Sequence, residues 1–225
     1  MKKLKGFLPF LGIASRYNLR LSLSYQLIFI VLAINYNSNI FAQCTSIPGV
    51  EAITNGDFSL GDDGSSTFGN HVVMPYTYNY SWPGHYWIGN NAQELSLNNP
   101  LIYDHTKGDA TGKMLMIDGI QAANEVAWQQ VNLTIIPGQT YYFSAWITSL
   151  YPTERSTMQF QVKGNNDADW TILGPSVEAP NVGVWQQIFE TWNSGTNTSA
   201  DIRLVNENLL LYGGSGNDYA IDDIS

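Results

Sequence analysis

The sequence has almost no cysteine and few basic residues. Cys44 is the single cysteine in 225 residues, so no disulfide can form within the chain. Ten Lys and Arg stand against 19 Asp and Glu, which gives a net charge of −9. Nucleic acid is excluded as a partner, because phosphate binding needs clustered Lys and Arg. The fold must therefore be stabilised by its core, by a metal ion, or by both.

The first 42 residues differ in charge from the rest. They contain five of the ten basic residues, no acid, and an apolar run at 27–34. Basic residues, an apolar run and a small residue at Ala42 are the layout of a secretory signal peptide. The alternative is a retained membrane anchor, but this run is shorter than the ~20 residues that a span needs. We expect a signal peptide over 1–42, a secreted or cell-surface protein, and no stable membrane span after cleavage.

The remaining residues, 43–225, keep five basic residues against 19 acids and show no helical pattern. No stretch has an apolar stripe of period 3.6 with caps. Short runs instead alternate with period two, and turn-forming residues separate them. These runs are Met114–Asp118, Val126–Leu133, Thr140–Thr148, Met158–Val162, Trp185–Trp192, Ile202–Val205 and Asp218–Ser225. The pattern predicts a single all-β domain over 43–225, a β-sandwich or jelly roll.

In two of these runs, the sequence does not decide which of the large side chains face the core. Phe143, Ala145 and Ile147 alternate with Tyr142 and Trp146, so one set must face away from the core. Trp185 and Trp192 raise the same question, since a bulge between them would change the side that each one reaches.

Two short motifs resemble one known family of modules, and a third motif between them resembles another. Asn55-Gly56-Asp57-Phe58 and the closing run 219–224, Tyr-Ala-Ile-Asp-Asp-Ile, resemble the galactose-binding-like jelly-roll carbohydrate-binding modules of the CenC type, families 4, 9 and 22. Asp104-His105-Thr106 is similar to a signature of MAM-type adhesion domains. The resemblance implies a galactose-binding-like jelly roll that binds a polysaccharide or glycan. The alternative that it implies is an adhesion or structural module with a cell-surface protein as partner.

The same resemblance implies a structural calcium ion. Calcium takes six to eight oxygen ligands from carboxylates, carbonyls and water. The implied ligands are Asp57, Asp104, Thr106, Asp222 and the Lys113 carbonyl. By alternation Asp223 is expected on the opposite side from Asp222, in solvent. The alternative is an ordinary Asn-Gly turn and two solvent-facing acids at the end of a strand.

The aromatic segment Pro75–Trp87 is the candidate ligand-binding region. Four of its rings, from Tyr76 to Trp82, fall at every second position, so in extended backbone they share one face. Flat rings with polar edges suit sugars, whose apolar faces stack on them. The alternative is that these rings pack against the core. The candidate ligand-binding residues are Tyr76, Tyr78, Tyr80, Trp82, His85 and Trp87.

Catalytic motifs are missing from the sequence. The three histidines have no metal-ligand spacing, and no Gly-x-Ser-x-Gly motif occurs. A glycosidase needs two carboxylates that face each other across a cleft, but most glutamates here stand beside turns or at strand ends. We expect no catalytic residues and no enzyme activity, with a small glycoside-active jelly roll as the alternative.

Overall fold

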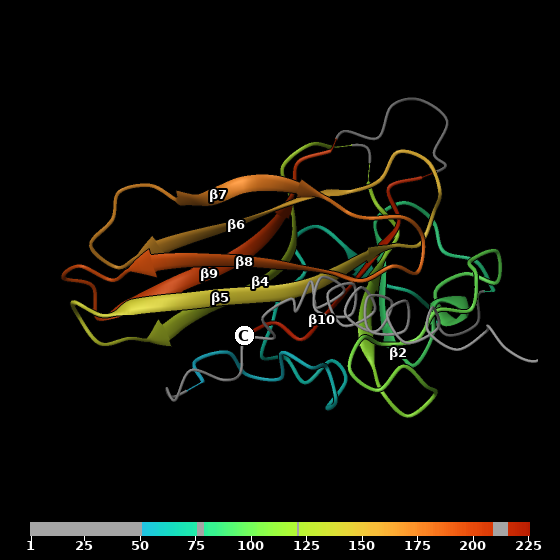
Figure 1. Ribbon diagram of the computed structural model, residues 1–225, viewed down its shortest axis with the longest axis horizontal. Coiled ribbons are helices and arrows are strands. Elements are labelled where there is room, and N and C mark those ends of the chain that lie inside the picture. Colours follow the sequence, from blue (N-terminus) through green and yellow to red (C-terminus); the bar gives the residue numbers. More distant parts are fainter. Residues whose placement is uncertain (1–50, 76–78, 121, 209–215) are drawn as a thin grey trace, which may run out of the picture. The chain divides into compact units, whose positions relative to one another are not determined.

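The computed structural model describes residues 51–225, apart from 76–78, 121 and 209–215. The calls on the signal peptide and on Tyr76 and Tyr78 lie outside the described residues. Within the described part of the chain, no helix has the length and hydropathy of a membrane span. The regular structure of this part is strands, with one short 3-10 helix, η1 (Ala92–Glu94) (Figure 1).

The strands confirm the predicted all-β class. Their bounds are β1 (Val72–Val73), β2 (His85–Gly89), β3 (Met114–Ile117), β4 (Glu125–Thr134), β5 (Thr140–Ser149), β6 (Thr157–Gly164), β7 (Thr171–Glu178), β8 (Gln186–Asn193), β9 (Ser199–Asn206) and β10 (Tyr219–Asp222). Each run expected from alternation contains or overlaps one of these strands. The alternation missed β1, β2 and β7.

Two sheets form the sandwich. One has six strands in the order β1-β2-β3-β10-β5-β8, and the other has four in the order β4-β9-β6-β7 (Figure 1). All pairs are antiparallel except β1 with β2. Strand β10 lies between β3 and β5, from which it is far removed in sequence. This arrangement is the jelly-roll sandwich that the sequence predicted.

The main core lies between the two sheets, and its members show which side chains of β5 face inward. Phe143, Ala145 and Ile147 belong to this core, with exposed fractions of 7% or less. Tyr142 therefore points away from it and is 45% exposed. The β5–β8 register is continuous over eight pairs. Because β8 has no bulge, Trp185 and Trp192, seven residues apart, lie on opposite sides, and Trp192 joins the main core.

A second apolar cluster covers part of the outer face of the six-stranded sheet. Met114, Met116 and Ala220 point outward from β3 and β10 and are fully buried. Side chains from two connecting segments, 91–102 and 182–185, pack over them: Ala92, Leu95, Ile102, Val182 and Trp185. The outer face is thus covered over β3 and β10, whereas Tyr142 on β5 and Phe189 on β8 remain 45% and 42% exposed.

The burial of β10 gives a stability prediction. Ile221 on β10 is fully buried, so Ile221→Ala should lower the free energy of unfolding by about 2–5 kcal/mol. Ile172 on β7 is 59% exposed, and Ile172→Ala should change it by less than about 0.5 kcal/mol. Urea denaturation of both variants measures the difference. Equal effects of the two substitutions would contradict the central position of β10.

Candidate functional site

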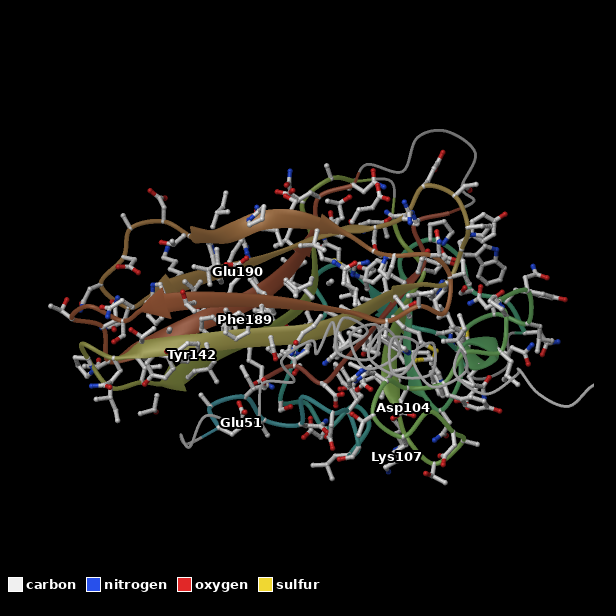
Figure 2. The ribbon with its side chains drawn as sticks, viewed as in Figure 1. Glu51, Asp104, Lys107, Tyr142, Phe189 and Glu190 are labelled. Atoms are coloured by element: carbon white, nitrogen blue, oxygen red, sulfur yellow. The ribbon has the colours of Figure 1, made fainter. Side chains whose placement is uncertain are left out.

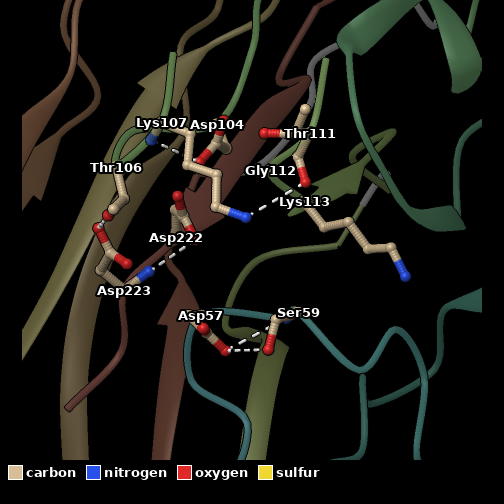
Figure 3. Close-up of a pocket in the computed structure, with 10 residues that line it drawn as sticks. All are labelled: Asp57, Ser59, Asp104, Thr106, Lys107, Thr111, Gly112, Lys113, Asp222 and Asp223. Carbon is tan, nitrogen blue, oxygen red and sulfur yellow. Dashed lines mark hydrogen bonds between the residues drawn. The ribbon is translucent and has the colours of Figure 1, made fainter. Parts of the chain in front are cut away.

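One cavity of about 100 Å³ gathers three segments that are far apart in the sequence (Figure 3). The segment 57–59 comes from the first described turn, 104–113 precedes β3, and 222–223 ends β10. The lining residues are Asp57, Ser59, Asp104, Thr106, Lys107, Thr111, Gly112, Lys113, Asp222 and Asp223. All five residues that the sequence nominated for calcium line this one cavity, which we call the acidic pocket.

The Asn55–Phe58 motif reaches the pocket because it is bonded to the chain beyond β10. Asn55 adopts a positive φ of 55°, and its side-chain oxygen accepts the Leu60 N–H at 3.0 Å. The Gly56 carbonyl accepts the Ile224 N–H at 3.0 Å. A Cβ at position 56 would clash with the Ile224 carbonyl, so only glycine fits there. The turn therefore holds Asp57 beside the end of β10.

Asp222 is the most buried acid of the pocket, with 1% of its surface exposed. One carboxylate oxygen accepts the His105 N–H at 2.8 Å, and the other accepts the Asp223 N–H at 2.9 Å. Burial, and after it the charge of Asp223, raise the pKa of Asp222 to about 8, although the two N–H donors act in the opposite direction. A negative charge at this position is therefore poorly compensated by the protein itself.

Asp104 has a carboxylate oxygen without a partner. Its Oδ2 accepts the Lys107 N–H at 2.9 Å, but the buried Oδ1 has no hydrogen-bond donor. Gly112 faces this carboxylate, and a Cβ there would overlap it. Buried acceptors are nearly always paired, so the unpaired Oδ1 marks a place where the pocket can take a ligand.

The expectation that Asp223 is a solvated acid on the opposite side from Asp222 is wrong. Its side chain lines the acidic pocket and is 26% exposed. Its Oδ2 accepts from the Thr106 hydroxyl and lies 2.8 Å from His105 Nδ1. Alternation fails here because β10 ends at Asp222, and Asp223 has a positive φ of 48° that turns the chain. Asp223 is the acid of the pocket that alternation missed, and His105, which contacts it, was not nominated either.

His105 is fixed by aromatic neighbours. Its ring stacks on Trp146 of β5, with 3.7 Å between ring centroids and 14° between planes. The ring of Trp185 meets it edge-on at 5.9 Å. This packing orients the His105 backbone N–H toward Asp222 and its ring toward Asp223.

Two lysines offset part of the negative charge of the pocket. Lys107 directs its ammonium to the Thr111 carbonyl at 3.3 Å, and the Lys113 side chain leads away from the acids (Figure 3). With all four acids ionised, the two lysines leave a formal charge of two negative units among the lining residues. Over the described ranges, no three His, Cys, Asp or Glu side chains already converge as metal ligands. Any cation would thus also need hydroxyl, carbonyl or water oxygens.

The aromatic segment does not form the extended run that the sequence predicted. Residues 79–80 form a bend, 83–84 form a turn, no strand is assigned between them, and β2 begins only at His85. The expectation of one strand face for Tyr80 and Trp82 is therefore wrong. Both rings are nevertheless open to solvent, Tyr80 at 47% and Trp82 at 53%.

The loop that carries these rings is anchored at both ends of its described part, where the Asn79 carbonyl accepts the Leu97 N–H at 3.0 Å and the Gly84 N–H donates to the Asp118 carbonyl at 2.9 Å. The Ser81 hydroxyl donates to Asp118 Oδ2 at 2.6 Å, and the Trp82 N–H donates to His85 Nδ1 at 3.1 Å. The His85 ring lies 5.9 Å from the Trp82 ring. Trp87 differs from the exposed rings, because it packs on the second cluster and donates to Glu94 at 3.1 Å.

A second pair of buried acids lies at the other end of β10. Asp118 follows β3 and Asp218 precedes β10, with exposed fractions of 8% and 9%. Burial raises the pKa of both carboxyls, and the Asp118 charge raises that of Asp218 further. The two acids therefore hold a proton between them at a pH where a solvated pair would be ionised.

The outer face of the four-stranded sheet carries a polar cluster that the sequence did not reveal. Arg203 on β9 lies 3.9 Å above the Trp170 ring and donates to Gln161 Oε1 on β6 at 2.6 and 2.9 Å. Gln159 and Gln161 are 5% and 8% exposed. Strand pairing places these groups side by side, and nothing in the sequence spacing indicates their contact.

Neither family models nor curated proteins match the sequence, but solved structures match the fold. The tandem of two family 22 carbohydrate-binding modules from Paenibacillus barcinonensis Xyn10C matches with a TM-score of 0.50 and 11% identity, over 77% of this chain and 43% of that one. The enzymatically active domain of bacteriophage CBA120 tailspike protein 4 has a TM-score of 0.47 and 10% identity, over 78% of this chain and 21% of that one.

A third match is the second family 22 module of the same Xyn10C, a xylan-binding domain. It has a TM-score of 0.46 and 10% identity, over 76% of this chain and 95% of that one. The described domain therefore has the β-sandwich fold of carbohydrate-binding modules, as the resemblance of the sequence implied. At these identities the likeness concerns the fold alone.

The Asp118–Asp218 pair predicts how stability depends on pH. The pKa of Asp218 is raised from 3.8 to about 8, so the folded protein binds a proton that the unfolded chain has lost. Stability should therefore fall as pH rises from about 4 to about 8. Asp218→Asn removes this group and should reduce the fall, as measured by urea midpoints across that range in EDTA.

The matched control for this prediction is Asp169→Asn, at an exposed acid. It should leave the pH dependence of the urea midpoint unchanged. The same pH dependence in Asp218→Asn and the wild type would show that the pair does not share a proton.

Proposed function

We propose that this chain is a non-catalytic module that binds a polysaccharide. Its fold is that of carbohydrate-binding modules, and proteins with one fold can differ in function, so the site must carry the argument. The observation that carries it is the anchored loop at 79–85, which presents the Tyr80 and Trp82 rings to solvent. Rings held in place bind sugar faces at a low entropic cost.

Polar groups near these rings supply hydrogen bonds to sugar hydroxyls. The Ser81 hydroxyl and the His85 ring belong to the same loop. Tyr76 and Tyr78, which the sequence also nominates, lie outside the described residues. The Arg203, Gln161 and Trp170 cluster on the four-stranded sheet offers a second contact surface of the same chemistry. A glycan that reaches either surface would meet an aromatic plane beside hydrogen-bond donors.

A structural calcium ion in the acidic pocket is the second part of the proposal. Two observations support it: the unpaired, buried Asp104 Oδ1, and the pKa of Asp222 raised to about 8. A cation bound by Asp104 and Asp222 would remove the cost of both. Asp57, the Thr106 hydroxyl and the Lys113 carbonyl would supply further oxygens, as calcium requires. The ion would join the Asn55–Phe58 turn, the segment before β3 and the end of β10.

Export is the third part, and it depends on the sequence alone. The basic, apolar and small residues of 1–42 support a signal peptide. A polysaccharide outside the cell is the ligand that such a protein would meet.

Chelation should lower the melting temperature of the purified protein. A ligand that binds only the folded state at about 100 times its Kd adds about 2.7 kcal/mol of stability, which for a domain of this size corresponds to about 5–10 °C. Asp222→Asn should remove this difference between calcium and EDTA, as measured by differential scanning fluorimetry. Asp218→Asn is the matched control, because this acid is equally close to β10 but lies outside the pocket. Identical melting curves of the wild type with calcium and with EDTA would refute the metal site.

Polysaccharide binding should depend on Trp82. Loss of one stacked ring costs about 1–2 kcal/mol at a binding site, so Trp82→Ala should weaken binding about tenfold. Affinity electrophoresis in gels containing soluble xylan, β-glucan or mannan measures the change. Val184→Ala is the control, since Val184 and Trp82 are both 53% exposed. Arg203→Gln, run in the same gels, reports on the second surface. The proposal fails if no polysaccharide retards the wild type.

A further inference from the structure

The outer face of β5 and β8 is open beyond the second apolar cluster. The cover ends near Trp146, where His105 stacks on the ring and Trp185 meets His105 edge-on. Farther along β5, Ser144 and Tyr142 point outward. Phe189, on the neighbouring strand β8, pairs with Ser144. The distance from Tyr142 to Trp146 is four residues, or ~13 Å of strand. We call this open stretch the β5–β8 face.

Two exposed rings occupy the middle of this face. Tyr142 and Phe189 lie on neighbouring strands (Figure 2), with 6.0 Å between ring centroids and 29° between planes. They are 45% and 42% exposed. The two strands fix the rings nearly parallel to each other, and this pair is larger than the single exposed apolar residues that are normal on a surface.

The side chains around these rings carry no charge. By strand alternation, eight positions point outward where β5 and β8 pair, and they hold only hydroxyl, amide and aromatic groups. They are Thr140, Tyr142, Ser144, Trp146, Gln187, Phe189, Thr191 and Asn193. The charged residue of β8, Glu190, points inward instead, against Gly174 of β7, where a Cβ would clash with its carboxylate (Figure 2).

The absence of charge on this face is informative because the chain is acidic. The net charge is −9, and the outer face of the other sheet carries Arg203, Asp201 and Lys163. A basic partner protein would be attracted to acidic surfaces and would gain no ion pair on the β5–β8 face. A neutral, hydroxyl-rich chain needs what this face offers, which is flat rings for its apolar faces and hydroxyl and amide groups for its oxygens.

We propose that the β5–β8 face is a third glycan-binding surface, apart from the Trp82 loop and the Arg203 cluster, on which an uncharged polysaccharide stacks along Tyr142 and Phe189. This inference rests on the proposed function and adds to it the class of polysaccharide and a surface apart from the Trp82 loop. Gln187 and Thr191, which are not buried, provide the polar contacts beside the rings, whereas the Ser144 hydroxyl is buried and lies 2.9 Å from that of Ser225.

The test compares the wild type with the double variant Tyr142→Ala, Phe189→Ala. Retardation is measured in gels that contain a neutral xylan or β-glucan, and in gels that contain polygalacturonate, an acidic polysaccharide. The wild type should bind the neutral polymers and not the acidic one, and the double variant should lose at least about tenfold in affinity. Leu60→Ala, an exposed apolar residue outside all the proposed glycan surfaces, is the control and should bind as the wild type does.

Conservative variants show whether the rings themselves act. Phe189→Tyr keeps the ring and should retain binding. An unchanged melting temperature of the double variant shows that a loss of binding is not a loss of fold. Because both rings are more than 40% exposed, we expect little change in stability.

The outcomes separate this inference from the proposed function. If no polysaccharide binds the wild type, both fail. If Trp82→Ala loses binding and the double variant does not, the proposed function stands and the β5–β8 surface is refuted. It is also refuted if light scattering shows a wild-type dimer that the double variant dissociates, because the face would then bind a second copy of the chain. Preference for polygalacturonate would refute the assignment to an uncharged ligand.

Discussion

The pairing of β10 with both β3 and β5 is the interaction on which the rest of the structure depends. Its four residues are fully buried or nearly so, and they complete the middle of the six-stranded sheet. Tyr219 and Ile221 point into the main core, while Ala220 and Asp222 point outward. A strand of four residues thus contributes to both apolar clusters and to the acidic pocket. Without it β3 and β5 would have no common neighbour.

The position of β10 also explains where the buried charge lies. Asp218 and Asp222 stand at its two ends, each beside a second acid from another segment. A strand inside a sheet has no freedom to turn these carboxylates to water, so their charge must be met by protons, by N–H donors or by a cation. The chain meets it differently at the two ends. At one end, Asp118 and Asp218 share a proton. At the other end, the pocket around Asp222 contains an unpaired carboxylate oxygen on Asp104.

Much of this architecture could be predicted from the sequence, and the failures have identifiable causes. Alternation located β5 well, because its inward residues are uniformly apolar. It missed β7, whose Gly174 and Pro175 are typical of a turn, although an edge strand tolerates both. It misplaced Asp223 because alternation holds only within a strand. The local sequence does not reveal that Asp223 adopts a left-handed φ directly after the strand ends. The five residues nominated for calcium line one cavity, whereas the contact of Arg203 with Trp170 depends on sheet register, which spacing does not reveal.

The place of β10 has a consequence for how the chain acquires its fold. Strand β3 ends at Ile117 and its partner begins only at Tyr219, so the sheet depends on contacts across about a hundred residues. Folds dominated by such distant pairings form slowly, in the millisecond to second range. As the chain emerges from the ribosome, β3 and β5 are complete long before β10 can join them. Until then each has an unpaired edge rich in apolar side chains, which is the arrangement most open to pairing with another chain. The newly made protein is therefore most exposed to aggregation in the interval before residues 219–222 are made.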